Sequence, residues 1–316
     1  MTAIVFTILP VFAVALAGYI LSRSGLISAE GVKGFSNVTF YLFVPALLFR
    51  AMRTVHFDEL DGRPLLAYFG GALLIFAMVM AASRRWLKRS ARHATVTALA
   101  VTFSNTVLLG IPLIKLSYGD PGLVILLTII SLHALVLYST ATLFLEFGGN
   151  PLDDNATRPG MGRIQLWEPL RNTFLSPVIL PILVGLLWGL FRLPVSDSID
   201  APLALLGTAA GPCSLVLLGA SLAHYGIAEH WRPAATLTVL KNLVFPLLIW
   251  AIGAYVLGLS GLALAVVTVT AALPIGANVF LFAQRYQVAQ GEITAAVALS
   301  TAASVITLTA VMLLFG

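Results

Sequence analysis

Long apolar segments dominate this chain and restrict the folds that it can adopt. Ten stretches of mostly apolar residues follow one another with short polar connections between them. They span 2–22, 34–53, 64–82, 94–115, 121–146, 173–192, 200–222, 233–257, 261–285 and 291–315. A helix of about 20 residues crosses a hydrocarbon core of about 30 Å. The pattern predicts an all-α membrane protein with ten transmembrane helices.

Composition argues against soluble and enzymatic functions. Hydrophobic residues make up 59% of the 316 residues and charged residues only 10%, against about 25% in a soluble domain. The single cysteine, Cys213, supplies no thiolate cluster for a metal. Because no phosphate loop, nucleophile elbow or metalloprotease helix occurs in the sequence, we expect no enzyme, cofactor or metal site. The formal charge of +5 fits a cytoplasmic membrane face better than nucleic acid.

The distribution of basic residues predicts the orientation of the chain in the membrane. Of the 18 Lys and Arg residues, twelve lie in connections that follow odd-numbered segments and five in connections that follow even-numbered ones. Cytoplasmic loops carry the excess of positive charge. We therefore expect the odd connections in the cytoplasm and both termini outside.

Two of the ten segments are interrupted near their centres. Residues 103–119 read FSNTVLLGIPLIKLSYG, and residues 271–287 read AALPIGANVFLFAQRYQ. Proline removes a backbone donor and clashes with the preceding helical turn. Because lipid offers no hydrogen bonds, such breaks are tolerated only against protein or a wet cavity. Paired breaks in the two halves of a chain indicate the binding site of a secondary transporter.

The two halves of the sequence repeat each other. Pro10 in the first segment matches Pro181 in the sixth at an offset of 171, and Tyr118 matches Tyr286 at 168. Each half has five segments, an odd number, so the second half enters the membrane from the opposite side. The sequence therefore predicts two inverted repeats, 1–146 and 173–316. The linker 147–172 is rich in Gly, Pro, Asn and Asp and is expected in the cytoplasm.

The motifs at the two breaks resemble a known family. SNTVLLGIPL in the fourth segment and LPIGANVFLFAQRY in the ninth strongly resemble the auxin efflux carrier family. LPVFAVALAGYILSRSGLIS and NVTFYLFVPALLF look like the first two helices of that family. The family includes plant PIN proteins and bacterial permeases for malate and malonate, within the superfamily of bile-acid, arsenite and riboflavin transporters. The resemblance covers essentially the whole chain, although the long regulatory loop of the plant proteins is missing.

This resemblance implies an architecture and a mechanism. It implies ten helices in two inverted repeats, with helices four and nine crossing at their breaks. It also implies a scaffold of helices one, two, six and seven, which forms a homodimer surface. The remaining six helices would form a transport domain that moves like an elevator. By its similarity to the bacterial permeases, the chain is expected in the cytoplasmic (inner) membrane of a bacterium.

The breaks are the predicted binding site for a small organic anion. Each break begins a half-helix inside the membrane, and the positive end of a helix dipole favours an anion. Asn105 and Asn278 can bond either a carboxylate or loose backbone groups. By resemblance, Pro112, Pro274 and Asn278 belong to the substrate site. The other candidates are their small or polar neighbours Ser104, Thr106, Gly110 and Gly276. The alternative is that these residues only satisfy and pack the crossing.

Two ionisable side chains are expected deep in the membrane. Lys241 lies eight residues past Pro233, about 12 Å along a helix, and His133 lies twelve residues past Pro121, about 18 Å along. Lys241 either acts on the anion or extends its amine to the membrane surface. His133 either carries a proton or bonds a backbone carbonyl. No acidic residue falls in the middle of a segment, so a sodium site built on a buried carboxylate is not expected.

The sequence as a whole predicts a secondary carrier of a small organic anion. Both auxin-like aromatic acids and malate- or malonate-type carboxylates suit a site made of helix dipoles. Arg50 and Arg53 at the outer end of the second segment are expected as interface anchors or as a funnel for anions. Two alternatives remain open: a sodium- or proton-coupled symporter of the bile-acid type, and a membrane sensor that binds ligand without moving it.

Overall fold

The computed structural model describes residues 2–54, 61–147, 175, 177–223 and 230–315, and almost all of these residues are helical. Within these ranges there is no strand, only one isolated bridge between extended residues. The predicted all-α class is therefore confirmed. Apart from Phe147, the predicted linker 147–172 lies outside the described residues.

The helices follow the order of the predicted segments. In the first half they are α1 (Thr2–Arg23), α2 (Ala29–Val38), α3 (Val44–Met52), α4 (Arg63–Arg85), α5 (Ala91–Thr102) and α6 (Ile111–Phe147). In the second half they are α8 (Ile179–Leu190), α9 (Asp197–Leu222), α10 (Trp231–Val239), α11 (Phe245–Ala251), α12 (Gly261–Ala272), α13 (Asn278–Arg285) and α14 (Gln290–Leu313).

Prolines determine where several helices widen. The π-helical turns Thr39–Phe43, Thr106–Gly110 and Leu240–Val244 each end two residues before a proline, namely Pro45, Pro112 and Pro246. A proline has no N–H for the carbonyl one turn earlier, and its ring crowds that carbonyl. A π turn relieves the crowding by adding one residue to the turn. The first and third of these turns join α2 to α3 and α10 to α11 without a break in the helical rod.

Several of the helices are suited to cross a membrane. In the part of the chain that the structure describes, six stretches are long and apolar enough: Ala29–Met52, Arg63–Arg85, Thr106–Leu145, Asp197–Leu222, Trp231–Val256 and Gln290–Leu313. Leu9–Arg23, Ile179–Leu190 and Gly261–Ala272 are shorter apolar helices. The chain is therefore an integral membrane protein by the length and composition of its helices, whereas the count of ten spans and the inverted repeat stay predictions.

The fourth and fifth predicted segments meet within Ile111–Phe147. Two helices adjoin there at a kink at Gly119, whose φ of 64° and ψ of −157° are not helical. Glycine reaches a positive φ at little cost because it has no Cβ. The end of the fourth segment and the whole fifth segment thus form two helices that meet at a kink, as their prediction as separate segments requires.

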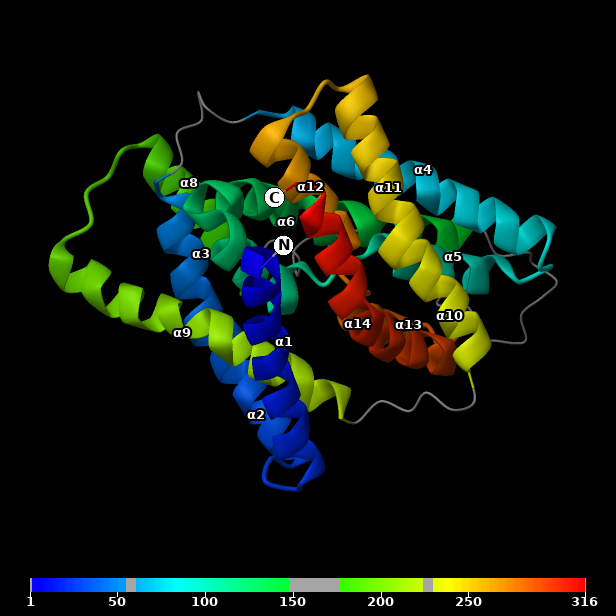
Figure 1. Cartoon of the computed structure of the whole chain (residues 1–316), viewed down its shortest axis with the longest axis horizontal. Helices are drawn as coiled ribbons and strands as arrows, with labels where there is room; N and C mark the ends of the chain where they lie inside the picture. Colours follow the sequence, from blue (N-terminus) through cyan, green and yellow to red (C-terminus); the bar gives the residue numbers. More distant parts are fainter. Residues whose placement is uncertain (1, 55–60, 148–174, 176, 224–229, 316) are drawn as a thin grey trace.

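The helices form two groups. In Figure 1, α1, α2, α3, α8 and α9 lie toward one side and α4, α5, α10, α11, α13 and α14 toward the other. In the first group α1 packs along α9, and α3 contacts both α8 and α9. A Cβ added to Gly219 would lie 1.6 Å from the Ala15 carbonyl oxygen, so the backbones of α9 and α1 are in direct contact. Small residues allow this close approach of membrane helices.

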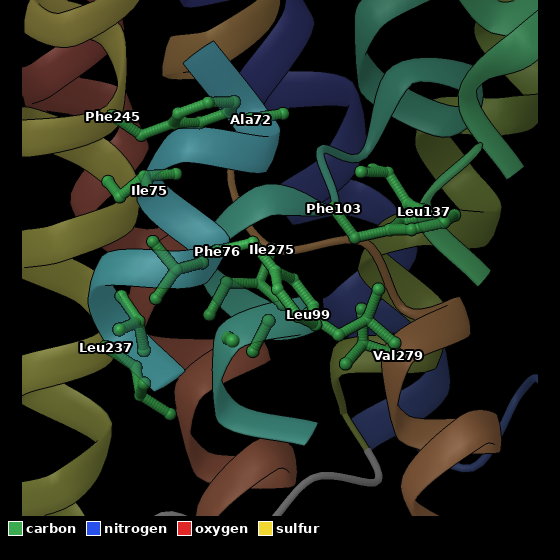
Figure 2. Close-up of a cluster of buried hydrophobic side chains, with 14 of the residues drawn as sticks. Ala72, Ile75, Phe76, Leu99, Phe103, Leu137, Leu237, Phe245, Ile275 and Val279 are labelled. Atoms are coloured by element: carbon green, nitrogen blue, oxygen red, sulfur yellow. The ribbon is translucent and has the colours of Figure 1, made fainter. Parts of the chain in front are cut away.

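The second group has a hydrophobic core of its own. Its buried members come from α4, α5, α6 and α10–α14 together with the break segments, and Figure 2 labels ten of them. None of its buried members in the described part of the chain comes from α1, α2, α3, α8 or α9. A second cluster joins the first group to parts of α6, α12 and α14. Phe103 and Ile275 of the two break segments are buried members of the core of the second group.

Candidate functional site

The two interrupted segments lie side by side at their breaks. α5 ends at Thr102 and α12 at Ala272, and extended residues follow each helix. Ser104 and Ile275 form an antiparallel bridge. Its hydrogen bonds run from the Asn105 N–H to the Pro274 carbonyl (2.8 Å) and from the Gly276 N–H to the Phe103 carbonyl (2.9 Å). Each broken segment therefore satisfies backbone groups that the other break leaves without a helical partner.

Two of the predicted glycines permit this close contact. A Cβ on Gly276 would lie 2.9 Å from Cδ1 of Phe103 and 3.2 Å from the Ser104 carbonyl oxygen. A Cβ on Gly110 would lie 2.7 Å from Cδ1 of Leu273. A larger residue at Gly276 would therefore crowd the first break segment, and one at Gly110 would displace the Leu273 side chain.

Lys241 caps the broken end of α12. It lies in the π turn before Pro246 and is fully buried. Its Nζ donates to the carbonyl oxygens of Ala271 (2.5 Å) and Leu273 (2.6 Å). The last carbonyls of a helix have no partner within the helix, so this amine replaces the missing donors. The alternative that the amine reaches the membrane surface is wrong.

The third contact of the Lys241 amine is a hydroxyl group. Nζ lies 2.9 Å from Oγ of Ser104, and it also lies 4.9 Å from the centroid of the Phe245 ring. A hydroxyl can accept a hydrogen bond from an ammonium group or donate one to a neutral amine. The site therefore fits Lys241 in both of its charge states.

His133 joins the same buried network through a tyrosine. The Tyr68 hydroxyl donates to Oγ of Ser104 (3.0 Å) and lies 3.1 Å from Nε2 of His133. The ring of Phe103 contacts His133 edge-on, with 4.4 Å between centroids. Instead of the backbone carbonyl considered from the sequence, His133 has the Tyr68 hydroxyl as its partner. One chain of polar contacts thus runs from Lys241 through the bridge residue Ser104 and Tyr68 to His133.

The two predicted asparagines differ in their surroundings. Asn105 follows the bridge at φ −75° and ψ 64°, and it is 5% exposed. Its Nδ2 is buried without a hydrogen-bond partner among the described residues. Buried donors are nearly always paired, so an unpaired one calls for a particular explanation, such as a ligand or a water. Asn278, the first residue of α13, is exposed.

Sequence reasoning missed two residues of this region. Tyr68 is fully buried in the middle of α4, where a lone hydroxyl in the apolar run LLAYFGG was the available signal. Oγ of Ser300 in α14 accepts from the Ile275 N–H (3.1 Å) and so supports the second break. Serine is common in membrane helices because it bonds back to its own helix, as Ser300 also does to Val297, and its position gave no signal.

Comparison with known proteins decides the family. A family described as "Membrane transport protein" matches residues 3–312. The chain belongs to the membrane transport protein family. This match confirms the resemblance to auxin efflux carriers and indicates a membrane transporter rather than an enzyme.

Two relatives of this membrane transport protein differ in how much of it they match. A protein of Rhizobium meliloti (strain 1021) named "Putative malonate transporter" is 24% identical over 323 aligned residues, which cover 99% of this chain and 96% of the relative. The "Lysosomal cholesterol signaling protein" of Mus musculus is 28% identical over 113 residues, which cover 35% of this chain and 13% of that protein. The similarity to the first relative is therefore end to end, and the similarity to the second is partial.

The transporter also contains a cavity of about 740 Å³. Residues of α1, α3, α6 and α9 line it, so it lies between the two groups of helices. Pro112 is the predicted site residue in its wall, where it lies beside Gly211. One part of the lining is apolar, with Val11, Leu47 and Leu215 among its residues. Charged side chains line the rest: Arg50, Arg53, Lys115 and Asp120.

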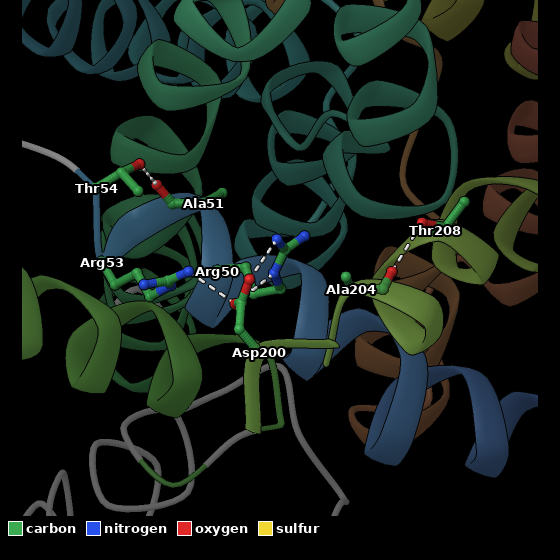
Figure 3. Close-up of polar contacts among 7 residues, drawn as sticks. All are labelled: Arg50, Ala51, Arg53, Thr54, Asp200, Ala204 and Thr208. Atoms are coloured by element: carbon green, nitrogen blue, oxygen red, sulfur yellow. Dashed lines mark hydrogen bonds and ion pairs between the residues drawn. The ribbon is translucent and has the colours of Figure 1, made fainter. Parts of the chain in front are cut away.

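The two arginines of the cavity share one carboxylate (Figure 3). Arg50 binds Asp200 with both arms of its guanidinium group, Nε to Oδ1 and Nη2 to Oδ2, each at 2.9 Å. Nη2 of Arg53 donates to Oδ1 of the same carboxylate at 2.7 Å. Lys115 pairs with Asp120 on α6. The arginines therefore connect the end of α3 to the first turn of α9.

Proposed function

We propose that this membrane transport protein carries a small organic anion across the cytoplasmic membrane and binds it beside the bridged breaks. The observation that carries the proposal is the buried, unpaired Nδ2 of Asn105. This group lies next to the bridge residue Ser104, whose hydroxyl contacts the Lys241 amine. A carboxylate oxygen would give this donor its missing partner. The half-helices that begin at Thr106 and Asn278 would add the positive ends of their dipoles.

The substrate class is inferred from the relative that the chain matches end to end. Its printed name supports a short dicarboxylate such as malonate as the first substrate to test. An auxin-like aromatic acid, suggested by the family resemblance, is the second. Both carry the carboxylate that the site requires.

The proposed mechanism is an elevator-like movement of one group of helices against the other. In this proposal α1–α3, α8 and α9 form the scaffold and the homodimer surface, and the other helices form the transport domain. The separate core of the second group supports movement as a rigid body. The contact of α1 with α9 and of α8 with α3 would be equivalent under an inverted repeat of ten helices, which supports that architecture. Both termini would lie outside.

The first experiment measures malonate flux in proteoliposomes made from the purified protein. We expect flux without sodium, and we expect Asn105→Ala and Asn278→Ala to reduce it about tenfold or more. Hydrogen bonds to a charged group contribute about 1.5–3 kcal/mol, which corresponds to this range. Asn37→Ala, at an exposed position of α2, is the matched control and should transport at the wild-type rate.

Three outcomes would contradict this proposal in different ways. Wild-type flux by both asparagine variants would remove these residues from the site. A strict requirement for sodium would favour the symporter alternative. Stabilisation of the protein by malonate or by indole-3-acetate, without flux under any gradient of either acid, would favour a sensor.

A further inference from the structure

The charged end of the cavity has more cations than anions. Arg50 and Arg53 come from α3 and Lys115 from α6, whereas the two carboxylates are Asp120 and Asp200. The group therefore has a net charge of +1 when all five side chains are ionised. Lys115 and Asp120 neutralise each other, so the excess positive charge lies at the two arginines, which share one carboxylate. An anion that enters the cavity would meet a positive potential there.

Asp200 is bound to the arginines as a carboxylate ligand would be. The two-armed contact with Arg50 matches the geometry in which guanidinium groups bind carboxylates generally. The side chains of Arg50, Arg53 and Asp200 are 34%, 22% and 24% exposed, so solutes can reach this cluster. Nε of Arg53 is buried and has no partner among the described residues. Arg50 thus binds Asp200 through two of its nitrogens, whereas Arg53 binds it through one and leaves its Nε unpaired.

We propose that the Arg50–Arg53 pair is a docking site for the carboxylate of the transported acid, and that this carboxylate replaces Asp200 on the guanidinium groups. The rest of the acid occupies the adjoining part of the cavity. This inference rests on the proposed function, because it takes the transported acid as the ligand. It assigns a step of capture to the cavity, before the acid reaches the bridged breaks.

A purely structural role for the ion pair makes a different prediction. Asp200 lies in the first turn of α9 and Arg50 in the last turn of α3, and both positions suit the helix dipoles. If the pair only joined these two helices, removal of either partner would lower stability and leave ligand affinity unchanged. If Asp200 competes with the ligand, removal of Asp200 strengthens binding and removal of Arg50 weakens it. Affinity changes of opposite sign in the Asp200 and Arg50 variants therefore distinguish competition with the ligand from a purely structural role.

The test is calorimetric measurement of malonate binding to the purified full-length protein and its variants. Arg50→Gln should raise the dissociation constant about tenfold or more, as expected for the loss of a charge-assisted pair. Asp200→Asn should lower it severalfold, because its amide no longer neutralises the arginines. Arg63→Gln is the matched control, since Arg63 also binds an aspartate, Asp61, with both side chains exposed and outside the cavity lining. Its dissociation constant should not change.

Several results would overturn the inference. Weaker binding by Asp200→Asn, or unchanged binding by both Asp200→Asn and Arg50→Gln, would leave the cluster as an ion pair between helices. If Arg50→Gln fails to fold, Arg53→Gln replaces it, and we expect it to bind malonate more weakly. If Asp200→Asn fails to fold, Asp200→Glu replaces it, and we expect it to retain binding.

Malonate flux by wild type with unaltered KM in the arginine variants would reject this docking site alone. Absence of both binding and flux of malonate and indole-3-acetate in wild type would reject the proposed function as well. A bound anionic phospholipid that malonate does not displace, detected by native mass spectrometry, would assign the arginines to lipid.

Discussion

Lys241 is the residue whose surroundings explain most about the bridged breaks. Its depth in an apolar segment follows from the sequence, because it lies eight residues past Pro233 at the start of that segment. Its partners do not, since the carbonyls that it caps lie 30 and 32 residues further along the chain. A buried amine is tolerated only if its donors are paired, and the end of a broken helix supplies carbonyls that need donors. The buried amine and the free carbonyls of the broken helix thus satisfy each other's hydrogen bonds.

This compensation predicts a large effect of Lys241→Met. Methionine preserves much of the side-chain volume but leaves the Ala271 and Leu273 carbonyls without their donor. Each buried group without a partner costs about 1–3 kcal/mol. We therefore expect a clear fall in the melting temperature together with loss of flux. Lys33→Met, at an exposed position of α2, should change neither. A Lys241→Met protein with the wild-type melting temperature would show that the cap is not needed for stability.

Individual residues of the site could be predicted from the sequence to different extents. Ser104, Gly110 and Gly276 lie at the predicted breaks, because glycine and small polar residues next to proline are a local signal. That Ser104 also contacts Tyr68 depends on how α4 packs, which no local pattern contains. The partner of Arg50 and Arg53 was likewise missed, since Asp200 lies in the other half of the sequence.

At the scale of elements, the breaks themselves were the clearest signal. Pro274 lies between the end of α12 at Ala272 and the start of α13 at Asn278, as predicted, whereas α5 ends at Thr102, ten residues before Pro112. The antiparallel bridge between the breaks depends on the relative placement of two distant segments and was not predictable in detail. The fourth and fifth segments were predicted as separate helices, and α6 departs from helical geometry at Gly119 between them.

The contact between the two breaks predicts an effect of Gly276→Ala. The added methyl group would lie within 3.2 Å of the Phe103 ring and the Ser104 carbonyl, so the break segments must separate. Overpacking of this kind costs about 1–3 kcal/mol, and we expect reduced flux with a lower melting temperature. Gly70→Ala in α4 is the control, because nothing lies within 4 Å of the added atom. It should stabilise the helix by up to about 1 kcal/mol. Equal stability of the two variants would argue against a tight contact.

At the scale of the whole molecule, the two groups of helices could not be derived from sequence periodicity. Matching prolines and tyrosines indicate two related halves, but each group of helices takes members from both halves. Which helices share a core depends on packing between elements far apart in the chain. The packing of the helices produces this division, and residues from both sides of it line the cavity beside Pro112.

The proposed movement between the groups can be tested with a disulfide. A Cβ on Gly211 of α9 would lie 3.6 Å from the Cβ of Pro112 of α6, within the range of about 3.5–4.5 Å for disulfides. We expect Pro112→Cys with Gly211→Cys, in a Cys213→Ala background, to lose flux on oxidation and to regain it on reduction. Each single cysteine variant, treated with the same oxidant, is the control. Undiminished flux by the fully cross-linked protein would reject a sliding motion at this contact.

The bridge between Ser104 and Ile275 has a thermodynamic consequence for the direction of transport. The two bridged segments belong to one hydrophobic core, through Phe103 and Ile275. The proposed binding site around Asn105 would therefore keep its contacts if that group of helices moves as one body. A binding site that keeps its contacts has the same affinity for its substrate on either side of the bilayer. Such a binding site does not by itself favour transport in one direction. The solute gradient and the membrane voltage then decide whether a cell gains or loses the acid.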